Sequence, residues 1–173
     1  GYSFSTESDV EVILHLYQEY GYEGIHKLNG MFAFTLVDLK KQETYIVRDR
    51  LGIKPLYYSN TGKSLLFGSE LKAIIANQSA DTSLNLNTLS HYLSTFYTAA
   101  PNSIFKNIFA LEPGHYLKIK EGQVRDHLYW DVQLTNKHLD WKENQILEKF
   151  DDLFNKSVNG SSVSLSISVG PPK

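Results

Sequence analysis

The sequence contains no cysteine, and this absence excludes several kinds of chemistry. Without a thiol, these 173 residues can form no disulfide, no thiolate zinc site and no thiol nucleophile. An excess of charge of one sign is also lacking, because 17 Lys and Arg stand against 19 Asp and Glu, for a formal net charge of −2. We therefore expect neither nucleic acid nor an acidic membrane surface as a partner.

Targeting and catalytic motifs are absent too. No apolar stretch approaches the length of a membrane span, and the residues after Gly1 lack the pattern of a signal peptide, so we expect a cytoplasmic protein with no membrane association. No two of the six histidines stand four apart around a glutamate, and no G-x-S-x-G elbow occurs, so we expect no metal bound by this chain. Gly62-Lys63-Ser64 resembles the end of a phosphate-binding loop, but Tyr57 occupies the position of the required earlier glycine. We interpret this tripeptide as a hairpin turn.

Apolar segments of strand length dominate the middle of the sequence. Four of them, at 31–37, 44–47, 56–58 and 64–67, are separated by short polar turns, and a further hairpin is predicted at 115–119 and 123–129. The four segments between 31 and 67 predict one antiparallel sheet. With helices on either side of it, the sequence predicts an α+β fold.

Helical spacing marks the remaining segments. Ser8 and Glu11 have capping-box spacing at the start of an amphipathic helix that Gly21 and Gly24 end. Three further helices are predicted, at 69–76 with Ser69 as its cap, at 86–96, and at 141–158.

Both ends of the sequence are abrupt. The chain opens a few residues before a helix, and after Asn159 a Ser-rich stretch that is compatible with one more strand runs to Ser168 before the terminal Pro171-Pro172-Lys173. We expect the chain to be incomplete at both ends.

Four motifs give the sequence a family resemblance. FSTESDVEVIL at 4–14, LNGMFAF at 28–34, RDRLGIKPLYY at 48–58 and FGSELKA at 67–73 resemble, in order and spacing, the class II glutamine amidotransferases. The stretch from Ser103 to His115, followed by Tyr129 and Trp130, narrows the resemblance to glutamine-hydrolysing asparagine synthetases.

The resemblance implies a fold, a division into domains and an activity. The fold would be part of an N-terminal-nucleophile hydrolase αββα sandwich. Residues 1–135 would be the C-terminal part of a glutamine amidotransferase domain, and 136–173 a linker helix with the truncated start of an ATP-binding synthetase domain. The parent would release ammonia from glutamine and use ATP and Mg in the synthetase domain to amidate aspartate. Its partners would be glutamine and that domain, and a homodimer is compatible with the family; this chain would bind no cofactor.

The sequence also departs from that family. The initiating cysteine is absent, and so are the arginine and the Asn-Gly-Glu stretch that complete the family's glutamine pocket. No catalytic residue is therefore expected within the chain, and the chain alone is expected to be inactive. Two alternatives stay open: an amidotransferase of the same family acting on another carboxylate, and a non-catalytic binding or regulatory module that kept the fold.

The resemblance carries one functional residue. Asp9 matches the family's aspartate that binds the α-amino group of glutamine, and a carboxylate suits this task because a desolvated ammonium needs a paired anion. From the residues alone, an acid in the first turn of a helix is favoured by the helix macrodipole without any ligand. The resemblance favours the binding role.

The RDRLGIKPLYY motif offers further charged residues. Arg48 and Asp49 could be taken for a catalytic pair, but we interpret them as an ion pair or turn anchor at the end of a strand. For Lys54, a structural role and a role at a domain interface stay open.

Overall fold

The computed structural model describes residues 4–6, 8–133 and 140–161. The chain forms two compact units, residues 31–131 and residues 1–30 with 132–173, and each is described by itself. Within the described residues, no helix combines the length and the apolar character that a membrane crossing needs.

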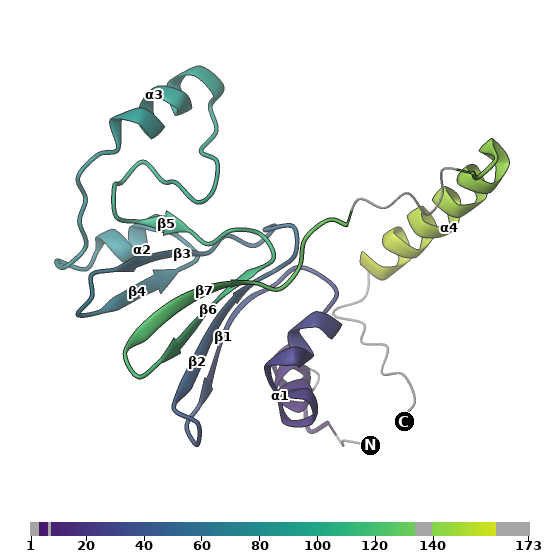
Figure 1. Cartoon of the computed structure of the whole chain (residues 1–173), viewed down its shortest axis with the longest axis horizontal. Coiled ribbons are helices and arrows are strands. Elements are labelled where there is room, and N and C mark those ends of the chain that lie inside the picture. The colour runs from purple at the N-terminus through teal and green to yellow at the C-terminus, as the bar shows by residue number, and fades with distance from the viewer. Residues whose placement is uncertain (1–3, 7, 134–139, 162–173) are drawn as a thin grey trace. The chain divides into compact units, whose positions relative to one another are not determined.

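The unit of residues 31–131 contains two antiparallel sheets (Figure 1). The four-stranded sheet has the order β1-β2-β6-β7, where β1 is Ala33–Asp38, β2 is Glu43–Arg48, β6 is His115–Lys120 and β7 is Gln123–Leu128. The three-stranded sheet has the order β4-β3-β5, where β3 is Tyr57–Asn60, β4 is Leu65–Gly68 and β5 is Phe109–Ala110.

The α+β class with antiparallel sheets and helices is confirmed, as are the four strands predicted between 31 and 67 and the later hairpin. The prediction that those four strands share one sheet is wrong. The second edge of β2 is taken by β6, in register from Glu43 opposite Lys120 to Val47 opposite Tyr116. β3 pairs with β4 and β5 in a separate sheet.

An apolar core lies between the two sheets. Ile46 of β2 and Leu117 of β6 are both 1% exposed, and they cluster with the buried side chains of Leu56 and Leu111. Tyr58 of β3 packs against the same cluster, together with Ala33, Leu65, Ile119 and Val124. Since side chains alternate along a strand, one face of the four-stranded sheet supplies this core and the other carries its own row of side chains.

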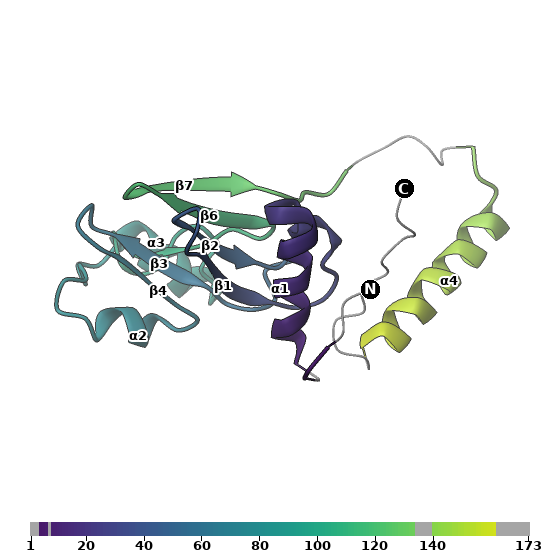
Figure 2. The same cartoon turned by 90° about the horizontal axis from the view of Figure 1, so that it is seen from below.

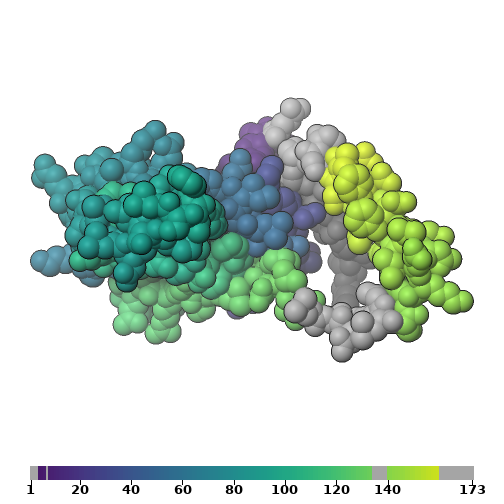
Figure 3. All heavy atoms as spheres, turned by 90° about the horizontal axis from the view of Figure 1, so that it is seen from above, coloured from purple at the N-terminus to yellow at the C-terminus, as the bar shows by residue number. Residues whose placement is uncertain are grey.

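Two helices belong to this unit. α2 (Leu71–Ile75) lies beside β3 and β4 (Figure 2), and its N-cap is Glu70, so the prediction that Ser69 caps it is wrong. Ser69 lies in the bend that follows β4, and no side chain caps the helix. Ile74 within this short helix is buried. α3 (Leu86–Thr95) is capped by the Asn85 side chain and stands at the surface of the unit (Figure 3).

The other unit contains α1 (Asp9–Tyr20), a 3₁₀ turn η1 (Gly21–Lys27) and α4 (Glu143–Ser161). Ser8 caps α1 by accepting a hydrogen bond from the Val10 N–H at 3.3 Å, and Gly21, with a φ of 61°, ends it, as predicted. The helix predicted at 141–158 is confirmed as α4. The strand considered up to Ser168 lies outside the described residues.

Candidate functional site

Asp9 is the first residue of α1, and its side chain is exposed. The chain just before it is gathered around the carboxylate of Glu11. That carboxylate accepts four hydrogen bonds, from the backbone N–H and hydroxyl of Ser5 (2.8 and 2.9 Å) and from the backbone N–H and hydroxyl of Thr6 (2.7 and 2.5 Å). The start of α1, and Asp9 with it, is therefore held by a compact hydrogen-bonded loop.

The hydrogen-bond partners of Glu11 differ from those that the capping-box prediction implies. Its carboxylate reaches back to Ser5 and Thr6 rather than to Ser8, whose N–H donates to the Thr6 hydroxyl at 3.3 Å. Hydrogen bonds from the Ser5 backbone first, and then from the Thr6 hydroxyl, lower the pKa of Glu11 to about 2. Glu11 is therefore an anion at neutral pH.

Asp9 itself is left available. Among the residues that the structure describes, none donates a hydrogen bond to its carboxylate. An exposed carboxylate on an ordered helix start can accept hydrogen bonds from a ligand ammonium.

Asp49 anchors the loop that follows β2. Its side chain is 1% exposed, with Oδ1 accepting hydrogen bonds from the N–H groups of Leu51 (3.1 Å) and Ile53 (3.0 Å). Oδ2 accepts a third from the N–H of Lys54 (2.9 Å). A loop without regular secondary structure thus has its backbone donors satisfied by one carboxylate.

Arg48 holds the same loop through the loop's backbone carbonyl groups. Its guanidinium donates to the carbonyls of Lys54 (2.8 Å) and Gly52 (2.7 Å), and a third donation goes to the carbonyl of Leu111. The interpretation of Arg48 and Asp49 as a turn anchor is confirmed, and the catalytic reading has no support from these contacts. Lys54 contributes its backbone N–H and carbonyl to the anchor, and its side chain is exposed.

Tyr129 joins this loop to the end of β7. Its hydroxyl donates to the Arg48 carbonyl at 2.8 Å, and burial, followed by the negative charge of Asp49, raises its pKa. The ring of the neighbouring Trp130 lies 5.7 Å from the Arg50 guanidinium. Two segments that the resemblance singled out separately are therefore in direct contact. Asp9 belongs to the other compact unit and is described apart from them.

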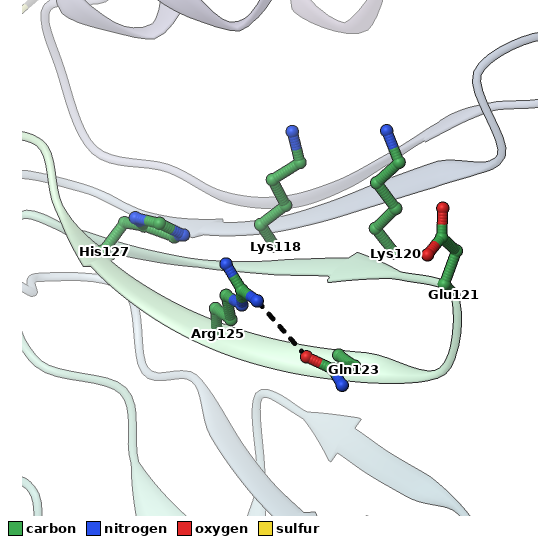
Figure 4. A pocket seen from close by; sticks show the side chains of 6 residues that line it. All are labelled: Lys118, Lys120, Glu121, Gln123, Arg125 and His127. Atoms are coloured by element: carbon green, nitrogen blue, oxygen red, sulfur yellow. Dashed lines mark hydrogen bonds between the residues drawn. The ribbon is translucent and has the colours of Figure 1, made fainter.

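A polar cavity of about 300 Å³ on the β6–β7 hairpin was missed by sequence reasoning (Figure 4). Alternation puts Lys118 and Lys120 on one face, and each amine forms an ion pair with Glu43, at 3.0 and 3.1 Å. The Tyr45 hydroxyl and then these lysines lower the pKa of Glu43 to about 2. Glu43 thus offsets part of the positive charge of a cavity that is also lined by Glu121, Gln123, Arg125 and His127.

Comparison with known families agrees with the motif-based resemblance. Residues 1–130 match the family model described as a glutamine amidotransferase domain. The chain belongs to this family, whose fold class agrees with the antiparallel α+β architecture observed here.

Individual relatives refine the comparison. Asparagine synthetase [glutamine-hydrolyzing] 3 of Bacillus subtilis is 38% identical over 141 residues, which is 81% of this chain and 23% of that protein. Asparagine synthetase [glutamine-hydrolyzing] 1 of the same organism is 32% identical over 160 residues, or 92% of this chain and 25% of that protein. Amidase chry2 of Gibberella zeae is 31% identical over 137 residues, or 79% of this chain and 20% of that protein. The chain therefore spans about a quarter or less of the length of these relatives.

Proposed function

We propose that this chain is the glutamine-binding part of a glutamine-dependent asparagine synthetase, in which Asp9 pairs with the α-amino group of glutamine. The observation that carries the proposal is the exposed Asp9 carboxylate, placed on an ordered helix start and given no donor by the described residues. A carboxylate forms strong charge-assisted hydrogen bonds with an ammonium ion. Membership of the glutamine amidotransferase family supports glutamine as its source.

In this proposal, some steps of the reaction need residues outside this chain. These residues include no cysteine, so the thiol that attacks the glutamine amide must come from outside them. The synthetase domain would use ATP and Mg to adenylate the aspartate carboxylate with release of pyrophosphate, and ammonia would then displace AMP. In this proposal, residues 1–135 belong to the amidotransferase domain and 136–173 lead into the synthetase domain. The protein works in the cytoplasm, and pairing into a homodimer is part of the same proposal.

One observation favours a second acceptor chemistry. The similarity to Amidase chry2 extends over 79% of this chain, so this type of domain also occurs in a protein that is not named an asparagine synthetase. Another carboxylic acid could therefore take the place of aspartate as the acceptor.

Product analysis of the protein made from the whole gene tests the proposal. The protein is incubated with ATP, Mg²⁺, glutamine and either aspartate or another carboxylic acid, and glutamate and the amide product are quantified. We expect asparagine and glutamate in equal amounts, with product only when aspartate is present. Amide formation only on a different acid would show that this acid, rather than aspartate, is the acceptor. Absence of both glutamate and amide would identify a non-catalytic module.

A further inference from the structure

A tight turn before β6 places two potential metal ligands next to each other. In Glu112-Pro113-Gly114-His115, the N–H of His115 donates to the Glu112 carbonyl at 3.2 Å, and Gly114 has a φ of +71°. Proline in the second position and a positive-φ glycine in the third are typical of a type II turn. Because the first and last residues of such a turn lie close together, Glu112 and His115 are neighbours.

The turn is fixed to the rest of the unit. The N–H of Gly114 donates to the Asp49 carbonyl at 3.0 Å, and its carbonyl accepts from the N–H groups of Tyr129 (2.8 Å) and Trp130 (3.2 Å). A Cβ on Gly114 would lie 2.2 Å from the Trp130 carbonyl oxygen, so no other residue fits without movement. The two side chains are therefore presented by a rigid support.

Asp126 brings a third potential ligand from the edge strand β7 (Figure 1). It is paired with Leu117, on the face where Val124 joins the apolar core, so a carboxylate stands in a row of apolar side chains. Its Oδ1 lies 2.7 Å from Nδ1 of His115, and both side chains are partly exposed, at 40% and 20%. The site is thus ordered and still accessible to an ion from solvent.

The charges of the cluster also favour a bound cation. Two carboxylates beside one imidazole leave net negative charge at the edge of an apolar core, and a bound dication would neutralise it.

We propose that Glu112, His115 and Asp126 bind a divalent transition-metal ion, with Zn²⁺ as the best-fitting ion. One ligand atom from each residue lies within 4.8 Å of the others. Zn²⁺ accepts both imidazole nitrogen and carboxylate oxygen as ligands, and the imidazole disfavours Mg²⁺ and Ca²⁺. The ion would tie the turn to the edge strand. Sequence reasoning expects no metal in this chain because the three ligands come from a turn and a strand and follow no regular spacing.

The alternative role of the cluster is an ordinary His115–Asp126 ion pair. An inward-pointing carboxylate on an edge strand also discourages pairing with another chain. Only a metal site predicts that Glu112 belongs to the same functional unit and that Zn²⁺ stabilises the fold.

Calorimetric titration of the tag-free chain with Zn²⁺ tests the proposal. We expect one equivalent of Zn²⁺ to bind, Mg²⁺ to bind far more weakly, and Zn²⁺ to raise the unfolding temperature in a concentration-dependent way. His115→Asn and Asp126→Asn should each weaken Zn²⁺ binding by at least about tenfold, since even loss of an outer-shell partner has effects of that size. His127→Asn is the matched control, because His127 is adjacent on β7 but lies on the opposite face.

Circular dichroism without metal confirms that each variant is folded. Should a variant fail that check, Glu112→Gln replaces it, since the backbone bonds of the turn do not involve the Glu112 side chain. Zn²⁺ binding of unchanged strength in the ligand variants, or equal binding of Mg²⁺ and Zn²⁺ to the unmodified chain, would overturn the proposal.

Discussion

At the scale of single residues, Arg48 and Asp49 together order the loop that follows β2. The carboxylate of Asp49 accepts from three backbone N–H groups, and the guanidinium of Arg48 donates to three backbone carbonyls. Charged groups form stronger hydrogen bonds than neutral ones, so two side chains suffice to order the loop. The loop after β2 therefore depends on these two charges for its shape.

Asp49→Ala should destabilise the unit strongly. Removing the carboxylate leaves the N–H groups of Leu51, Ile53 and Lys54 without their acceptor, and one unsatisfied buried donor costs about 1–3 kcal/mol. We expect a loss of about 3 kcal/mol or more in the free energy of unfolding, measured by urea denaturation. Asp151→Ala, at an exposed position of α4, should change it by no more than about 0.5 kcal/mol. Equal effects of the two substitutions would contradict the anchor role.

Glu11 gives the start of α1 a dependence on pH. The folded-state pKa is lowered to about 2, below the ordinary value of about 4.3, so the contribution of Glu11 to stability is complete above the ordinary value. It is lost as the pH falls toward 2, where the folded-state carboxylate takes up its proton. We expect Glu11→Gln to be less stable than the unmodified chain at pH 7, and this difference to shrink between about pH 4.3 and 2. Urea denaturation across that range measures it, and a difference independent of pH would show that the carboxylate charge is not involved.

At the scale of elements, local patterns predicted the helices and strands well but predicted sheet membership poorly. The Ser8 cap and the β6–β7 hairpin depend on residues close in sequence, and both were predicted. The pairing of β2 with β6 joins residues far apart in sequence, and the apolar character of a strand does not specify its partner. Ser69 has the chemistry of a helix cap, but α2 begins one residue later, after Glu70, and no side chain caps it.

The turn that leads into β6 provides a test of close packing. Gly114 and Gly62 both have positive φ, +71° and +77°, so alanine strains the backbone at either position. A Cβ at Gly62 meets nothing within 4 Å, whereas at Gly114 it would overlap the Trp130 carbonyl oxygen. We expect Gly114→Ala to lower the free energy of unfolding by about 1–3 kcal/mol more than Gly62→Ala does. Similar losses in the two variants would mean that the contact with Trp130 relaxes without cost.

At the scale of the whole molecule, the functional features differ in how far the sequence could predict them. The binding role of Asp9 stays a prediction from the family resemblance, while its position at a helix start followed from the Ser8 cap and is observed. The role of Arg48 and Asp49 as a turn anchor was predicted. Their contacts were not, because Arg48 also donates to the carbonyl of Leu111, which is far away in the sequence. The cluster of Glu112, His115 and Asp126 had no sequence signal, since it exists only once the turn and β7 are assembled.

The proposed binding of glutamine by Asp9 depends on the negative charge of its side chain rather than on the size of that side chain. Asn keeps the size of Asp and is also well tolerated near helix N-termini, so Asp9→Asn should leave the fold nearly unchanged. Loss of a desolvated ion pair costs about 2–5 kcal/mol, which is a fall of about thirtyfold or more in kcat/KM for glutamine. Asp151→Asn removes the same charge from an exposed site on α4 and is the control.

The most direct measurement compares asparagine synthesis from glutamine and from free ammonia, in the protein made from the whole gene, with and without Asp9→Asn. Free ammonia bypasses the glutamine pocket. We therefore expect Asp9→Asn to lower the glutamine-dependent rate by at least about thirtyfold and to leave the ammonia-dependent rate nearly intact. An equal loss with both nitrogen sources, or no loss with either, would contradict this expectation.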